Sequence, residues 1–238
     1  MSDDDKGQIT APYQPPYGSP IEDAVAWSLA KYLSCRASLH KQYEVETICG
    51  QFRLDFAVIS QSGYRVGYEC DGEDYHDEWR DEWRDAMILG DGLLDAIIRF
   101  RGTDIALHLN DILYIASRWD PVLFSDRGRS NLHTLAAREA RGFYAAREPY
   151  EAFVTYSADE EGRRRMNPAF VLVQRRCGTN VRGTTQFWCG LYSYAKGLGG
   201  GDLDSVIAAY QAKTKAEAKH NPFPEHDAPF AQDHEDED

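Results

Sequence analysis

Three carboxylates, those of Asp55, Glu69 and Asp71, are expected to meet on one face of a β-hairpin. Two runs of alternating sequence, residues 51–60 and 64–71, flank a Gln-Ser-Gly segment that is typical of a turn. Side chains on a strand alternate between its two faces, so Glu69 and Asp71 point the same way.

The register of this hairpin determines how close the first carboxylate comes to the other two. A turn that closes on Ile59 and Tyr64 places Asp55 near Tyr68. Asp55 then lies within one residue of Glu69, and directly opposite residues have Cβ atoms about 5 Å apart. The apolar residues of the first strand are expected to share the other face: Phe52, Leu54, Phe56 and Val58.

A carboxylate cluster of this kind resists ionisation unless a cation holds it. Mg²⁺ takes oxygen ligands and combines a few carboxylates with several waters and substrate phosphate oxygens. A metal-activated water and a polarised phosphoryl group are what phosphodiester hydrolysis requires. The alternative interpretation is a solvated strand face with ordinary charges, because acidic pairs two residues apart are common.

The elements that must position these carboxylates follow the order α-β-β-α-β-α, which predicts an α/β (α+β) fold. Ser19 is a suitable N-cap and Pro20 suits the first helical position, so a helix is expected to begin there and to end before about Ser38. Further helices are predicted for residues 77–89 and 103–119, and strands for 51–60, 64–71 and 94–100, with an extra strand at 43–49.

Five motifs occur in order along this part of the chain: SPIE at 19–22, FRLDF at 52–56, YECDGEDYH at 68–76, RDEWRD at 80–85 and IIRFRGTDI at 97–105. Together they resemble the PD-(D/E)XK nuclease superfamily, and most closely its branch similar to very-short-patch-repair endonucleases. The resemblance covers about residues 19–119. It implies a restriction-endonuclease-like mixed sheet flanked by helices, Mg²⁺ as cofactor with Mn²⁺ as a substitute, and DNA as the favoured substrate.

The resemblance also implies roles for individual residues. Asp55 and Glu69 would ligate the metal, and Glu22 would assist it directly or through water. Asp71 stands where many members of the superfamily carry lysine, although Glu-x-Asp-Gly is typical of this branch. His76 is therefore the candidate for proton transfer, because imidazole gains or loses a proton near neutral pH. Its alternative role is that of a hydrogen-bonded structural histidine.

Three arginines are candidate phosphate ligands. Arg80 and Arg84 are predicted to lie on the helix that follows the hairpin, where the alternative is an ion-paired surface. Arg99 lies in an apolar strand and needs a partner, for which Asp85 or a substrate phosphate is suitable. The same helix carries an apolar stripe that is expected to be core: Trp79, Trp83 and Met87.

The Asp120-Pro121 pair is a candidate domain boundary. Residues 1–18 are interpreted as a flexible leader, 19–119 as the nuclease core, 120–220 as a C-terminal α+β region of unknown role, and 221–238 as a disordered acidic tail. The C-terminal region is predicted to contain helices at 131–147 and 203–218 and strands at 151–157, 169–175 and 186–194. Its arginines and aromatic residues are interpreted as a solvated rim over a small sheet, or as a contact surface for nucleic acid or protein.

The formal net charge is −13, but it is unevenly distributed. Residues 1–6 and 225–238 hold 10 of the 39 acids and only 1 of the 26 Lys and Arg, so the middle of the chain has a net charge of −4. An acidic average therefore leaves DNA binding possible where acids surround metal ions and arginines lie elsewhere.

The five cysteines are widely spaced and contain no CxxC pair, which argues against a disulfide framework and a cysteine zinc site. Reduced thiols in a cytoplasmic protein are expected. No apolar run is long enough to predict a membrane span.

Three functions are consistent with these features. The leading hypothesis is a Mg²⁺-dependent DNA endonuclease that nicks or cuts in repair, restriction or phage defence. A catalytically inactive nuclease-fold protein that binds a protein partner through residues 120–238 is the alternative, and the absent lysine and the acidic charge favour it. The third option is the same chemistry on RNA.

Overall fold

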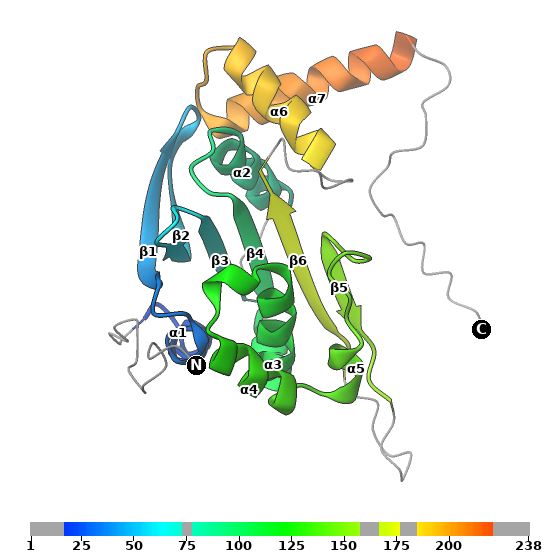
Figure 1. The fold of residues 1–238 in the computed structure, drawn as a ribbon. Coiled ribbons are helices and arrows are strands. Elements are labelled where there is room, and N and C mark those ends of the chain that lie inside the picture. Colours follow the sequence, from blue (N-terminus) through cyan, green and yellow to red (C-terminus); the bar gives the residue numbers. More distant parts are fainter. Residues whose placement is uncertain (1–16, 73–77, 158–166, 177–184, 221–238) are drawn as a thin grey trace, which may run out of the picture.

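The computed structural model describes residues 17–72, 78–157, 167–176 and 185–220. Six strands form one mixed sheet in the order β1-β2-β3-β4-β6-β5 (Figure 1). All neighbouring strands are antiparallel except β3 and β4, which are parallel. The strands are β1 (Ala37–Thr47), β2 (Gly50–Ser60), β3 (Arg65–Asp71), β4 (Ala96–Arg101), β5 (Glu151–Val154) and β6 (Ala169–Arg175). The predicted α+β class, a mixed sheet flanked by helices, is confirmed.

The helices fall into two groups on opposite faces of the sheet. Ile98 of β4 packs in the main core with one group, whereas its neighbour Ile97 packs against the other, as expected for adjacent strand residues. The first group contains α1 (Pro20–Tyr32), α3 (Gly102–Trp119), α4 (Asp126–Leu135) and the short α5 (Arg138–Arg141), and the 3₁₀ turn η2 (Pro121–Leu123) lies with it. The second contains α2 (Glu78–Gly90), α6 (Thr185–Gly197) and α7 (Leu203–His220).

The start of α1 agrees with the sequence. Ser19 is the N-cap, and its hydroxyl oxygen accepts a hydrogen bond from the N–H of Glu22 at 3.3 Å. Pro20 occupies the first turn, where a missing N–H removes no intrahelical bond. The side chain of Glu22 is thereby fixed at the end of α1 that lies near the start of α3, since Ile21 lies close to Gly102.

The β2–β3 hairpin forms with a register one residue from the predicted one. Ile59 pairs with Arg65 and not with Tyr64, and Phe56 pairs with Tyr68. Continued by one step, this register brings Asp55 opposite Glu69, closer than predicted.

The apolar residues of β2 do not share one face, so that prediction is wrong. Phe56 and Val58 pack in the main core, but Leu54 packs on the α2 side, where it contacts the backbone of Gly67. The change of face falls at Asp55, where the pairing with β1 is interrupted. The residue across from it, Gln42, has a left-handed φ of 47°, which is uncommon for a residue with a side chain.

The residues beyond Asp120 complete the same sheet, since β6 pairs with β4 and carries β5 at its edge. Two predicted elements in this region are wrong. Residues 186–194 are helical, within α6, and the helix predicted over 131–147 is divided into α4 and α5 by Ala136 and Ala137. The strand predicted at 43–49 forms as the last part of the longer β1, which ends at Thr47, so residues 48 and 49 lie in a turn.

Candidate active site

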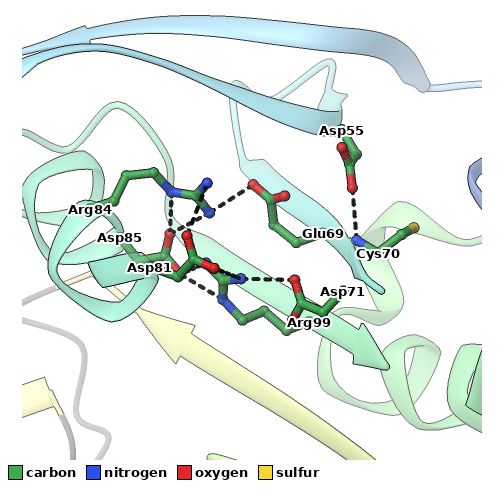
Figure 2. A network of polar contacts seen from close by, with 8 residues as sticks. All are labelled: Asp55, Glu69, Cys70, Asp71, Asp81, Arg84, Asp85 and Arg99. Atoms are coloured by element: carbon green, nitrogen blue, oxygen red, sulfur yellow. Dashed lines mark hydrogen bonds and ion pairs between the residues drawn. The ribbon is translucent and has the colours of Figure 1, made fainter. Parts of the chain in front are cut away.

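The structure brings the predicted acidic residues together where β2, β3 and α2 meet (Figure 2). Asp55 is fixed against β3 because its Oδ2 accepts a hydrogen bond of 2.8 Å from the backbone N–H of Cys70. Glu69 and Asp71 lie on either side of Cys70 and face two arginines. The side chain of Glu69 is 6% exposed, so this carboxylate is nearly removed from water.

The two arginines share one anchor, Asp85, which has no exposed surface. Arg84 donates from Nε and Nη2 to Asp85 Oδ1 at 3.2 and 3.1 Å, and from Nη2 to Glu69 Oε1 at 3.0 Å. Arg99 donates from Nε and Nη2 to Asp85 Oδ2 at 2.9 and 2.7 Å. Its Nη1 donates to Asp71 Oδ1 at 3.0 Å. The prediction that Arg99 needs a partner such as Asp85 is confirmed.

Acids outnumber bases in this cluster. Asp81 also lies within ion-pair distance of both guanidinium groups, at 3.6 Å from Arg84 and 3.8 Å from Arg99. Five carboxylates therefore face two arginines, which gives a formal charge of −3 when all are ionised: Asp55, Glu69, Asp71, Asp81 and Asp85 with Arg84 and Arg99.

The excess charge and the burial are reflected in two pKa values. Burial raises the pKa of Asp55 to about 6, and the charges of Glu22 and Asp71 add to this rise, against the Cys70 N–H. Burial also raises the pKa of Glu69 to about 8. Although Arg84 opposes this second rise at 3.0 Å, the loss of hydration outweighs one ion pair.

Glu22 lies near enough to Asp55 to raise its pKa, but the carboxylate of Glu22 is already well hydrogen-bonded. Its Oε1 accepts from the Ser19 hydroxyl at 3.0 Å. Its Oε2 accepts from the Gly18 N–H and from Gln42 Nε2, both at 3.1 Å. Glu22 thus caps α1 and ties it to β1, which makes it a weaker candidate for direct metal ligation than Asp55 or Glu69.

Two predicted site residues cannot be placed. His76 lies outside the described residues, and Arg80 is described for its backbone only. Gln42 is a site neighbour that the sequence did not indicate, since nothing in the sequence marks a left-handed glutamine on a strand. The spacing of Asp81, Arg84 and Asp85 on one helix did carry a signal, because residues three and four apart share a helical face.

Cys70, between Glu69 and Asp71, is poorly suited to be a nucleophile. Burial raises the pKa of its thiol well above the usual range, and the charges of Asp55 and Glu22 add to the rise. The thiol therefore stays protonated at neutral pH, and a thiol is a poor nucleophile. Cys35, Cys49 and Cys70 are all free.

The donor set of the acidic centre fits a divalent metal in part. Among the described residues, no three His, Cys, Asp or Glu side chains are arranged as ligands around one point. Asp55 Oδ1 and Glu69 Oε2, however, have no hydrogen-bond donor among those residues, and both belong to carboxylates with raised pKa values. Two carboxylates with vacant oxygens in an anionic site fit Mg²⁺, which keeps waters in its other positions.

Comparison with known proteins provides no further assignment. The chain matches no family model, and neither the curated proteins nor the solved structures contain a significant match. Within the described part of the chain, no helix combines the length and the apolar character that crossing a membrane requires.

Proposed function

We propose that this protein is a Mg²⁺-dependent endonuclease that hydrolyses phosphodiester bonds of DNA. The proposal rests on one observation above all. Asp55 and Glu69 come from neighbouring strands, each keeps one oxygen without a donor among the described residues, and each has a raised pKa. A divalent cation would supply the positive charge that the protein itself does not place beside this pair of carboxylates.

In this proposal the chain's own residues position the ion and balance the charge of the site. Asp55 and Glu69 would hold the ion, for which Mn²⁺ can substitute, with Glu22 acting through water because its oxygens are occupied. A bound ion would supply an activated water and polarise the phosphoryl group. Asp71 restrains Arg99 through the 3.0 Å hydrogen bond between them. His76 would move the proton, in place of the lysine of the superfamily pattern, where this chain has Asp71.

The choice of DNA and of a role in repair, restriction or phage defence follows from the sequence resemblance. Cleavage of RNA by the same residues is the third option. A cytoplasmic location and contacts to nucleic acid through Arg80, Arg84 and Arg99 are part of the proposal. In support, Arg84 and Arg99 lie at the acidic cluster.

A plasmid-nicking assay tests this function. Wild type should convert supercoiled DNA to open-circular or linear forms with Mg²⁺ or Mn²⁺ and remain inactive in EDTA. Asp55→Asn and Glu69→Gln should each reduce the rate by at least about 100-fold, because each removes a proposed ligand. Glu46→Gln is the matched control, an exposed acid on β1, and should retain full activity. A single-stranded RNA substrate in parallel distinguishes the third option.

One observation favours the alternative, a catalytically inactive nuclease-fold protein that binds a partner through residues 120–238. Glu69 and Asp71 are already ion-paired with Arg84 and Arg99, as in a purely structural network. No cleavage of any nucleic acid by wild type would favour this alternative. Activity that survives both Asp55→Asn and Glu69→Gln would instead place the catalytic residues elsewhere in the chain.

A further inference from the structure

Arg84 and Arg99 are held unequally, although both bind Asp85. All three nitrogens of the Arg99 guanidinium donate hydrogen bonds to carboxylates, and the side chain is 9% exposed. Arg84 is 14% exposed, and its Nη1 has only an ion pair of 3.6 Å with Asp81. Arg84 is therefore the more easily displaced of the two.

The contact that Arg84 would give up is the one to Glu69. An ion on Glu69 Oε2 lies about 2 Å from that oxygen, and hence within about 7 Å of Arg84 Nη2, which binds the other oxygen of the carboxylate at 3.0 Å. Two positive charges at that distance repel each other strongly in a poorly hydrated site. The guanidinium is a rigid plane, so it moves as a whole. Asp85 Oδ1 accepts from Arg84 Nε at 3.2 Å and from Nη2 at 3.1 Å, and it can hold Nε while Nη2 swings away from Glu69.

The charge of Asp85 remains balanced when Arg84 turns. Arg99 donates twice to Oδ2 of Asp85, and these bonds do not involve Arg84. Because a buried carboxylate without a partner is costly, this second arginine is what makes the movement of Arg84 tolerable.

We propose that Arg84 is the built-in counter-ion of Glu69 and that a divalent cation at Asp55 and Glu69 displaces it, so that its guanidinium becomes available to a phosphate of the nucleic acid. This inference rests on the proposed function and names how its site couples ion binding to substrate binding. The ion and the phosphate then bind cooperatively, and by linkage each tightens the binding of the other.

The coupling is testable without turnover, by measuring the affinity for a fluorescein-labelled DNA duplex by anisotropy in EDTA at about pH 9, where Glu69 is ionised despite its raised pKa. Glu69→Gln removes the charge that holds Arg84 and should tighten binding about tenfold without any metal. Asp55→Asn is the matched control, because it removes an equal neighbouring charge but no partner of Arg84. It should change the affinity less than about twofold. Glu69→Gln combined with Arg84→Gln should lose the whole gain.

Several results would overturn the inference. One is a gain in duplex affinity in Asp55→Asn equal to that in Glu69→Gln, and another is a gain that survives the loss of Arg84. The others are no gain in affinity in Glu69→Gln and no measurable duplex binding in EDTA. Thermal melting checks that each variant folds. If Arg84→Gln does not, Arg84→Lys replaces it, since one ammonium cannot hold Asp85 and a phosphate together, and most of the gain should again be lost.

The plasmid assay separates this inference from the proposed function. If wild type nicks the plasmid but Glu69→Gln gains no affinity for the duplex, the endonuclease function is supported and the coupling is wrong. A gain that depends on Arg84, in a protein that cleaves nothing, leaves the coupling as the property of a DNA-binding protein.

Discussion

The acidic centre differs in charge balance from a second cluster of buried charge on this sheet. In the second cluster, Arg175 of β6 donates to both oxygens of Asp120 at 3.0 and 3.4 Å, and to the Tyr64 hydroxyl at 2.9 Å. The Tyr64 hydroxyl donates to Asp120 at 2.6 Å. One acid and one base neutralise each other there, and burial, with the charge of Asp120, raises the pKa of Tyr64 well above its usual range.

The charges of the acidic centre at Asp55 and Glu69 are not balanced in this way. Its carboxylates exceed its guanidinium groups, and two of them have raised pKa values. The second cluster joins strands on both sides of Asp120 and needs nothing from outside. Burial of charge alone therefore does not identify a functional site, whereas an excess of one sign makes the acidic centre the stronger candidate for one.

The largest effect is expected from removing the second cluster entirely. A chain that ends at Trp119 keeps every described residue of the acidic centre but loses Asp120, Arg175 and strands β5 and β6. It should be unfolded, because β4 would expose core residues that pack with β6. Circular dichroism and size-exclusion chromatography measure this. A soluble, cooperatively melting product would show that residues 19–119 form an independent domain.

A single break in the balanced cluster should cost less. Arg175→Met leaves Asp120, which is 3% exposed, as a buried charge without its ionic partner. The free energy of unfolding should fall by about 3–5 kcal/mol. Urea denaturation gives the value, and adding Asp120→Asn should recover part of it. An unchanged midpoint in Arg175→Met would mean that the ion pair is unimportant to the fold.

Removing one charge from the acidic centre should stabilise the metal-free protein, whereas Arg175→Met should destabilise it. A carboxyl group with a raised pKa in the folded state destabilises the fold once it must ionise. Metal-free wild type should therefore lose stability as the pH rises from about 4 to 6 through Asp55, and to about 8 through Glu69. Asp55→Asn keeps an acceptor for the Cys70 N–H but removes the charge.

Relative to wild type, Asp55→Asn should gain on the order of 1–2 kcal/mol between pH 4 and pH 7 in EDTA. Denaturation at both pH values measures the difference, and Glu46→Gln should show none. A variant that is equally destabilised at both pH values would indicate a structural role for Asp55 like that of Asp120.

The smallest effect concerns metal binding. An ion that binds only the folded protein adds about 1.4 kcal/mol at ten times its dissociation constant, or about 3–5 °C in melting temperature for a chain of this size. Mn²⁺ should stabilise wild type more at pH 8 than at pH 6, because protons compete for Glu69. Asp55→Asn should show a smaller shift. Equal shifts in both proteins would place the ion elsewhere.

Much of the acidic centre could be predicted from the sequence, because its parts are local. The hairpin, helix α2 and the partner of Arg99 follow from alternation, helical spacing and the cost of a buried unpaired charge. The face change at Asp55 could not be predicted in this way, because it depends on the backbone of a second strand at Gln42. The identity of α6 was missed because aromatic residues favour strands, although buried Leu191 and Ala195 have helical spacing.

The left-handed backbone of Gln42 has a consequence for how copies of this protein meet. Strand β1 is long and forms one edge of the sheet, so its outer N–H and C=O groups could template another strand. Gln42 lies at its middle, with φ of 47°, and its side chain is tied to Glu22 of α1. A flat ladder cannot run through such a residue, and exposed charges such as Lys41 and Glu44 flank it. The irregularity that borders the acidic centre thus also guards the open edge against self-association.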